Sequence, residues 1–232
     1  MTAGHDAPEW DARYAGSERV WSAAPNAWVA ATIRDWFTGR ALDLGAGEGR
    51  HSVWLAALGW QVTAVDFSAV GIERARQGAQ EVGVEVDWVV DDVRTWQPPR
   101  GATFDLVLVS YLHLDGDVLA RARGWLAPGG ALVVIGHALR NLTEGVGGPS
   151  DVRLLHTEAG YRVASEGLLV EQLGEVVRRA PQGDAIDLVL VARRPAPEQP
   201  APEQRAVEKP SAKQPSAGPS GTGGPQVDTR ED

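Results

Sequence analysis

The feature that most constrains this chain is a glycine-rich loop, Gly45-Ala46-Gly47-Glu48-Gly49, between a short apolar run and a segment of helical periodicity. Glycine lacks a Cβ, so backbone N–H groups in such a loop can approach a ligand closely. Asp66 ends the next apolar run, where a carboxylate can accept hydrogen bonds from ribose hydroxyls. The loop alone also fits a tight strand-to-helix turn, but with Asp66 it predicts a site for a nucleoside-containing cofactor.

The pattern around the loop alternates between strand-like and helix-like segments. Short runs rich in β-branched residues stand at 41–44, 62–65, 86–90, 104–109 and 131–135. Helical segments are expected at about 50–58 and from the N-cap Ser68 onward, which predicts a parallel sheet with crossover helices. Residues 168–178 and 185–192 read as an antiparallel pair joined by a turn at 181–184. An α/β fold that ends in a hairpin is therefore expected.

The composition changes near the C-terminus. Eight prolines and no aromatic residue follow from Pro195 to Asp232, so this segment cannot bury enough surface to offset its ordering entropy. We predict one folded domain over residues 1–194, which includes an N-terminal helical lid at 1–38, and a disordered tail over 195–232.

Composition also excludes several classes of partner. The net charge of −9 and the scattered arginines disfavour nucleic acid. No apolar stretch is long enough for a membrane span, and the N-terminus shows no export signal. The absence of cysteine excludes disulfides and thiolate metal sites, so we expect no metal centre and a cytoplasmic location. The oligomeric state is not predicted.

Further carboxylates distinguish between the possible cofactors. Asp43 precedes the loop by two residues, and Asp91-Asp92 end the third expected strand. With Asp66 they would make a site that repels a pyrophosphate and suits a sulfonium that also carries an amino group. The electrostatics therefore favour S-adenosylmethionine over a nicotinamide dinucleotide.

The motifs in this order resemble those of class I S-adenosylmethionine-dependent methyltransferases across nearly all of residues 1–194. They are Leu42-Asp43-Leu44-Gly45-Ala46-Gly47-Glu48-Gly49-Arg50, Val65-Asp66-Phe67-Ser68, Val90-Asp91-Asp92-Val93, Phe104-Asp105-Leu106-Val107 and Leu126-Ala127-Pro128-Gly129-Gly130. The resemblance implies a Rossmann-like, seven-stranded, mostly parallel sheet of order 3-2-1-4-5-7-6, with strand 7 antiparallel and helices on both faces. The inferred hairpin agrees with this order.

The resemblance also implies roles for individual residues. Asp43 would orient the loop and the amino end of the cofactor, Asp66 would hold the ribose, and Asp92 would accept the adenine amino group. Ser110 would lie near the methionine amino group, and Val93 would offer its backbone N–H to adenine. The full expected cofactor set is Tyr14, Asp43, Gly45, Ala46, Gly47, Arg50, Asp66, Phe67, Asp91, Asp92, Val93 and Ser110.

The N-terminal segment is similar to the lid of small-molecule members, including thiopurine and tellurite-resistance methyltransferases. Trp10, Tyr14 and Trp21 are its aromatic residues, and aromatic faces over a sulfonium would gain about 0.5–2 kcal/mol by cation–π attraction. The alternative is that they only pack a helix onto the sheet. Both interpretations stay open at this point.

Candidates for catalysis follow the central strands. His113 and His137 fall just after the fourth and fifth expected strands, and histidine can accept a proton at neutral pH. We predict His113, His137 and Tyr111 as catalytic, although each histidine can equally be a polar residue that caps a strand end or a helix. Arg140 could pair with an anionic acceptor, but a solvated loop arginine is the more ordinary interpretation.

The sequence after the fourth strand narrows the substrate class. Ser110-Tyr111-Leu112-His113 stands where enzymes that methylate nucleic-acid amino groups would carry an Asn/Asp-Pro-Pro-Tyr motif, so a small-molecule acceptor is expected. Two alternatives remain. A nicotinamide-dependent oxidoreductase is disfavoured because the glycine motif is incomplete and residues 1–194 contain no lysine. A non-catalytic S-adenosylmethionine-binding protein stays open.

Overall fold

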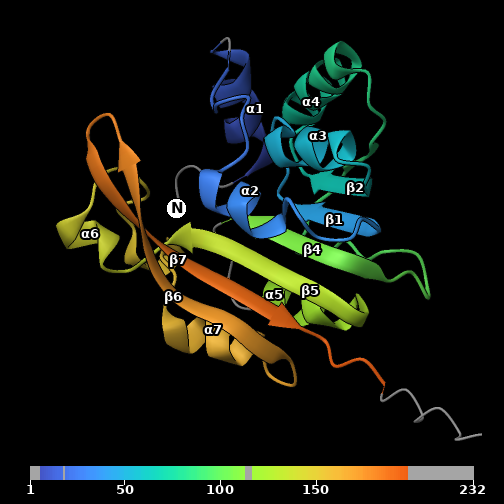
Figure 1. Cartoon of the computed structure of the whole chain (residues 1–232). Coiled ribbons are helices and arrows are strands. Elements are labelled where there is room, and N and C mark those ends of the chain that lie inside the picture. The colour runs from blue at the N-terminus through green and yellow to red at the C-terminus, as the bar shows by residue number, and fades with distance from the viewer. Residues whose placement is uncertain (1–5, 18, 113–116, 198–232) are drawn as a thin grey trace, which may run out of the picture. The chain divides into compact units, whose positions relative to one another are not determined.

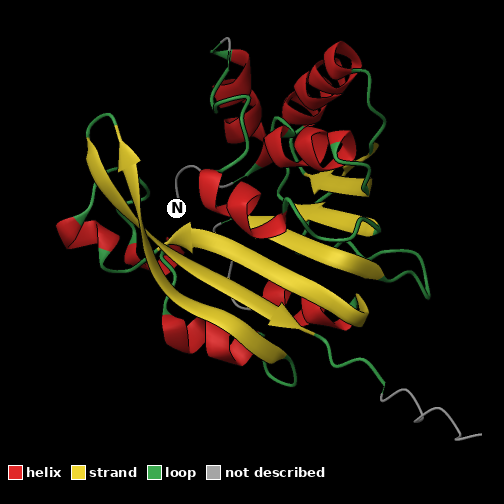
Figure 2. Cartoon of the chain, viewed as in Figure 1, coloured by secondary structure: helices red, strands yellow, loops and turns green. Residues whose placement is uncertain are grey.

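The computed structural model describes residues 6–17, 19–112 and 117–197, and these residues form a seven-stranded sheet. Its strands are β1 (Arg40–Leu44), β2 (Gln61–Asp66), β3 (Asp87–Val90), β4 (Phe104–Ser110), β5 (Leu126–His137), β6 (Leu169–Ala180) and β7 (Gly183–Arg193). The order is β3-β2-β1-β4-β5-β7-β6, with β7 antiparallel to both its neighbours and the other pairs parallel (Figure 2). The predicted fold class and strand order are confirmed.

Helices cover both faces of this sheet (Figure 1). They are α1 (Ala7–Ala15), α2 (Ala27–Ile33), α3 (Arg50–Ala57), α4 (Ala69–Val82), α5 (Asp117–Gly124), α6 (Asn141–Glu144) and α7 (Glu158–Ala164), with a 3-10 turn at Val152–Leu154. Buried side chains of α2 and α3 pack on one face, and those of α5 and α7 pack on the other. No helix among the described residues is both long and apolar enough to span a membrane.

The core consists of two layers that share the central strands. In β1 and β4, alternate residues point to opposite faces, so Leu42 and Val107 belong to one layer while Ala41 and Leu106 belong to the other. All four are fully buried. This double burial explains why the strands read as continuous apolar runs, as parallel sheets covered on both faces do.

Local signals set the helix starts near the loop. The Ser68 side chain accepts a hydrogen bond from the Gly71 N–H, which confirms the predicted N-cap of α4. Asn26 caps α2 in the same way through the N–H groups of Trp28 and Val29. Gly49 precedes α3 in the left-handed region at φ 74°.

Element boundaries differ from the expectations in a few places. The strand β5 begins at Leu126 and includes the Pro128-Gly129-Gly130 turn, and the hairpin connection shortens to Pro181 and Gln182. The segment between β5 and β6 contains the short helices α6 and α7. Of the expected tail at 195–232, residues 198–232 lie outside the described residues.

Candidate functional site

The glycine loop connects the carboxyl end of β1 to α3 in a conformation that side chains would disturb. Gly45 and Gly47 have positive φ values of 74° and 55°. A Cβ at Gly45 would lie 2.7 Å from Leu112 Cδ1, and one at Gly47 would lie 2.6 Å from the Tyr14 hydroxyl oxygen. The loop is therefore a cradle that only glycine can form at these two positions.

Asp66, at the carboxyl end of β2, is bonded to this loop. Its Oδ2 accepts a hydrogen bond from the Gly47 N–H at 2.8 Å, and its Oδ1 accepts one from the Ser68 N–H at 2.9 Å. Burial raises the pKa of this carboxyl, and the two backbone hydrogen bonds partly offset that effect. Asp66 thus joins the loop to the start of α4 at the position expected for a ribose ligand.

Asp43 and Ser110 place further polar atoms at the same edge. Asp43 is 1% exposed, and its Oδ2 accepts a hydrogen bond from Ser52 Oγ at 2.6 Å. Burial raises the pKa of Asp43 to about 6. The Ser110 hydroxyl is buried at the end of β4 and has no hydrogen-bond partner among the described residues. Because an unpaired buried hydroxyl is costly, it fits a ligand group such as the amino end of the expected cofactor.

The carboxylates that follow β3, Asp91 and Asp92, are more exposed than Asp43 and Asp66. The Asp92 carboxylate accepts hydrogen bonds from Arg94 Nε at 2.9 Å and Nη2 at 2.6 Å, and this lowers its pKa. Asp91 accepts the Asp92 N–H at 2.7 Å, and Val93 is buried in the core. The Asp92 carboxylate would have to accept the adenine amino group in addition to Arg94. The contact between Asp92 and adenine stays a prediction.

The N-terminal segment lies on the loop through Tyr14. This side chain is 3% exposed and packs between Gly47 and Gly71, and its helix α1 packs against α4. Trp10 contacts the rings of both Tyr14 and Trp21, at centroid distances of 5.5 and 6.4 Å. Of the three predicted aromatic residues, Tyr14 therefore lies against the glycine cradle, and α1 packs on a helix rather than on the sheet.

Glu48, which the sequence analysis did not single out, fixes the connection between α1 and α2. Its Oε2 accepts hydrogen bonds from the N–H groups of Val20 and Trp21, both at 3.0 Å. Its Oε1 pairs with Arg74 of α4 at 3.1 Å. The loop residue thereby holds the segment that precedes α2 against the cradle.

Tyr111 follows β4 in a strained backbone conformation and is heavily hydrogen-bonded. Its φ is 53°, and among the described residues Tyr111 is the one residue other than glycine with a positive φ. Its hydroxyl donates to Asp187 Oδ2 at 2.6 Å and accepts from Asn26 Nδ2 at 2.9 Å and from Arg178 Nε at 3.2 Å. Burial and the Asp187 carboxylate raise its pKa, so Tyr111 stays protonated and holds other groups in place.

Asp187 is the centre of this cluster. It is fully buried on β7, directly opposite His137 of β5 in the strand register. Its Oδ1 lies 3.2 Å from His137 Nδ1, and its Oδ2 accepts from Arg178 Nε at 2.9 Å. Although burial raises the pKa of Asp187, the neighbouring His137 and the hydrogen bonds from Tyr111 and Arg178 bring it below its usual value. Asp187 is therefore an anion at neutral pH.

A neutral histidine supports the same cluster from α3. His51 Nε2 accepts a hydrogen bond from the Asn26 N–H at 3.1 Å. Burial, and secondarily the neighbouring Arg50 charge, lowers the pKa of His51 to about 3. His51 therefore positions the start of α2 beside Tyr111.

The predicted site residues thus fall into two adjoining groups. Asp43, Asp66 and Ser110 surround the loop, together with the half-buried residues Ala46, Arg50 and Phe67. Tyr111 and His137 belong to the Asp187 cluster. His113 lies outside the described residues.

Sequence reasoning missed Asn26, Arg178 and Asp187. One signal was available for Asp187, because it is the acidic residue inside the apolar run Ala185 to Ala192. A charged residue in a strand buried on both faces needs partners, and those partners usually mark a site. Asn26 and Arg178 carry no comparable signal, since their partners come from distant parts of the chain.

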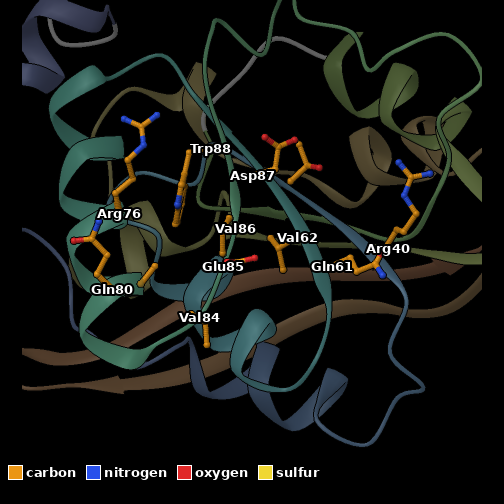
Figure 3. A pocket seen from close by; sticks show the side chains of 12 residues that line it. Arg40, Gln61, Val62, Arg76, Gln80, Val84, Glu85, Val86, Asp87 and Trp88 are labelled. Atoms are coloured by element: carbon orange, nitrogen blue, oxygen red, sulfur yellow. The ribbon is translucent and has the colours of Figure 1, made fainter.

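One cavity lies away from these groups. It measures about 660 Å³ and is lined by β2, β3 and α4, with Arg76, Gln80 and Trp88 around it (Figure 3). Its β2 residues, Gln61 to Thr63, come from the amino-terminal half of that strand, whereas Asp66 ends it. At the loop itself, the side chains of Leu112 and Tyr14 lie against Gly45 and Gly47.

The fold and the site together indicate the class of protein. A sheet of order 3-2-1-4-5-7-6, with a glycine loop after the first strand and an acidic residue at the end of the second, is the class I methyltransferase arrangement. Residues 41–130 match the family described as "Methyltransferase domain". The match covers part of this chain, from β1 to the turn within β5.

Individual comparisons agree with that assignment. Over 99 residues the chain is 35% identical to a ubiquinone biosynthesis O-methyltransferase of Caulobacter sp. (strain K31), a match that covers 41% of this chain and 39% of the relative. The N-methyltransferase NodS from Bradyrhizobium japonicum WM9, in complex with S-adenosyl-L-homocysteine, superposes with a TM-score of 0.63 at 18% identity, over 80% of this chain and 96% of NodS. TehB from Haemophilus influenzae superposes with a TM-score of 0.62 at 16% identity, over 80% of this chain and 67% of TehB. The chain thus matches about two fifths of the curated relative, and the solved structures establish the fold.

Proposed function

We propose that this protein transfers a methyl group from S-adenosylmethionine to a small-molecule acceptor. The observation that carries the proposal is the set of polar groups around the glycine cradle. Two buried carboxylates, Asp43 and Asp66, and the unpaired hydroxyl of Ser110 meet at the carboxyl ends of β1, β2 and β4. Such a site suits a ligand with ribose hydroxyls and a positively charged amino acid end.

When bound, S-adenosylmethionine supplies an activated methyl group that a nucleophile displaces in line. The chain's residues would bind and orient the two partners of this displacement. Asp66 would accept hydrogen bonds from the ribose, while Asp43 and Ser110 would hold the amino end. Tyr14 and the rest of the segment at 1–38 would act as a lid that excludes water from the loop.

On the acceptor side, His137 is our candidate for proton removal. Asp187 lies 3.2 Å from its Nδ1. If that contact keeps the proton on Nδ1, Nε2 is left to accept a proton from the acceptor. Tyr111 would hold Asp187 in place and would take no proton itself, because its hydroxyl already serves three partners.

The expected substrate class is a small molecule and not a nucleic acid. The net charge of −9 supports this choice. The relatives include both an O- and an N-methyltransferase, so we propose no acceptor atom. The absence of cysteine supports the cytoplasm as the compartment.

Calorimetric titration with S-adenosylhomocysteine tests the cofactor assignment. We expect the unmodified protein to bind it and Asp66→Ala to lose at least tenfold in affinity, because the ribose and the loop both depend on this carboxylate. Asp87→Ala, which removes an exposed carboxylate from β3, should bind normally. Stabilisation by a nicotinamide dinucleotide with no response to S-adenosylhomocysteine would refute the proposal.

A second experiment distinguishes an enzyme from a protein that only binds the cofactor. A metabolite extract would be incubated with the protein and isotopically labelled S-adenosylmethionine, and labelled products would be sought by mass spectrometry. We expect labelled products that disappear with Asp66→Ala. Cofactor binding with no labelled product above the Asp66→Ala background would favour the non-catalytic alternative.

A further inference from the structure

Two guanidinium groups from distant parts of the chain lie on Tyr111. Arg50 begins α3 directly after the glycine loop, and Arg178 comes from β6. The Cζ atom of each lies 5.7 Å from the centroid of the Tyr111 ring, so the two cations lie within twice that distance of each other. Two positive charges are thus gathered beside the loop of a protein whose net charge is −9.

Arg50 lacks a carboxylate partner within the part of the chain that the structure describes. Its recorded contacts are with the faces of Tyr111 and, at 6.0 Å, Trp21. The buried Asp43 carboxylate attracts Arg50 electrostatically, but its hydrogen bond is with Ser52. A half-buried guanidinium without an anion is costly, which points to an anion that arrives with a ligand.

The Arg178 guanidinium is hydrogen-bonded through Nε, while its two outer nitrogens can donate to a ligand. Its Nε donates to Asp187 Oδ2 and to the Tyr111 hydroxyl, at 2.9 and 3.2 Å. Its Nη1 and Nη2 make no hydrogen bond to other described residues, and its side chain is 35% exposed. The buried Asp187 therefore fixes the orientation of a guanidinium fork whose two outer nitrogens remain free to donate.

Other arginines near the site use their outer nitrogens in ion pairs, whereas Arg178 pairs with Asp187 through Nε. Arg140, considered above for an anionic acceptor, pairs with Glu175 at 2.9 Å and with Glu144 at 3.7 Å. Arg74 pairs with Glu48. Arg50 and Arg178 are thus the better candidates among these four for binding an anion.

We propose that Arg178, with Arg50 beside it, binds a carboxylate group of the methyl acceptor. The acceptor is accordingly a small carboxylic acid whose nucleophilic atom lies apart from that carboxylate. This inference rests on the proposed methyltransferase function. It goes further by naming the chemical class of the substrate and by placing Arg178 in its specificity.

A binding experiment tests this site without a known acceptor. Malonate would be titrated calorimetrically into the protein saturated with S-adenosylhomocysteine, with malonamide at equal ionic strength as the uncharged match. We expect malonate to bind, malonamide not to bind, and Arg178→Gln to weaken malonate binding at least tenfold. Arg179→Gln is the matched control, because Arg179 is the exposed next residue of the same strand and should change the affinity less than twofold.

Further variants separate a lost contact from a disturbed fold. Arg178→Lys keeps the charge but loses the fork, so we expect an intermediate loss of malonate affinity. Arg50→Gln should also weaken malonate. Equal malonate affinity in Arg178→Gln and Arg179→Gln, or equal binding of malonamide and malonate, would overturn the proposal.

The same variants determine which molecule supplies the carboxylate. S-adenosylhomocysteine would be compared with 5′-methylthioadenosine, which has no carboxylate. If Arg178→Gln weakened only the first, the carboxylate would belong to the cofactor and the acceptor assignment would be wrong. If the protein bound no S-adenosylhomocysteine but bound malonate through Arg178, the cofactor assignment would fail while the carboxylate site stood.

Discussion

At the scale of one residue, Asp43 is a buried carboxylate whose ionisation lowers the stability of the fold. It is 1% exposed, and Ser52 supplies its recorded hydrogen bond. Burial is the main reason that its pKa rises to about 6, and the nearby Asp66 carboxylate raises it further. An ionised carboxylate in such surroundings costs folding free energy. The positively charged ligand that we propose for this site would offset that cost.

The pH dependence of Asp43→Asn checks this account. A folded pKa of about 6 lies above the 3.8 that is ordinary for an aspartate, so the contribution of Asp43 to stability is present at low pH and lost as the pH rises through about 6. Asparagine does not titrate. We therefore expect Asp43→Asn to gain about 1 kcal/mol relative to the unmodified protein between pH 5 and pH 7.5. Urea unfolding at both pH values measures it, with Asp87→Asn as a control that should show no such gain.

At the scale of elements, the contact between α1 and α4 depends on one glycine. From the sequence, Gly71 is a local inconsistency, since glycine inside a helix costs about 0.5–1 kcal/mol relative to alanine. In the structure, a Cβ at Gly71 would lie 3.0 Å from Tyr14 Cε2 and 3.2 Å from the Gly47 carbonyl oxygen. Because Gly71 has no Cβ, the Tyr14 side chain of α1 can reach the glycine loop. This contact explains why a residue of low helix propensity stands at position 71.

A comparison of two glycines in α4 tests this explanation. Gly71→Ala should lower stability or weaken the binding of S-adenosylhomocysteine, because the new methyl group would displace Tyr14. Gly78→Ala should stabilise the protein by about 0.5–1 kcal/mol, since its nearest recorded neighbour is the Arg19 guanidinium at 3.8 Å. Urea unfolding and calorimetry measure the two effects. Equal stabilisation by both alanines with unchanged affinity would show that the Tyr14 contact does not constrain position 71.

At the scale of the whole domain, the Asp187 cluster connects elements from both ends of the sequence. It joins Asn26 at the start of α2 to Tyr111 after β4, His137 on β5 and Arg178 on β6. These connections hold the carboxyl edge of the sheet together beside the cofactor loop. The antiparallel β7 makes them possible, because its register brings Asp187 opposite His137.

Removal of this anion should be far more costly than removal of a surface one. Asp187→Ala would leave Arg178 and Tyr111 without their buried partner, and we expect a loss of about 3–5 kcal/mol. Glu175→Ala breaks the more exposed pair with Arg140 and should cost no more than about 1 kcal/mol. Denaturant unfolding of both variants gives the comparison. Similar losses in the two variants would contradict a central role for Asp187.

Much of the fold could be predicted from local patterns. The apolar runs located the strands, Ser68 marked the start of α4, and the motif order indicated the sheet order. Boundaries were less certain where a turn interrupts a strand, as at Pro128 to Gly130 within β5. The cofactor loop and Asp66 were found because their chemistry depends on spacing along the chain.

By itself, the sequence determined the class of fold, the position of the glycine loop and the acidic character of the site, because these follow from periodicity and local residue types. Only the tertiary structure brought Asn26, Tyr111, Arg178 and Asp187 together, since their partners are far apart in the chain and are set by strand register. The packing of Tyr14 against Gly47 and Gly71 has the same origin. Contacts of that kind depend on how the whole sheet is assembled, so no local pattern in the sequence predicts them.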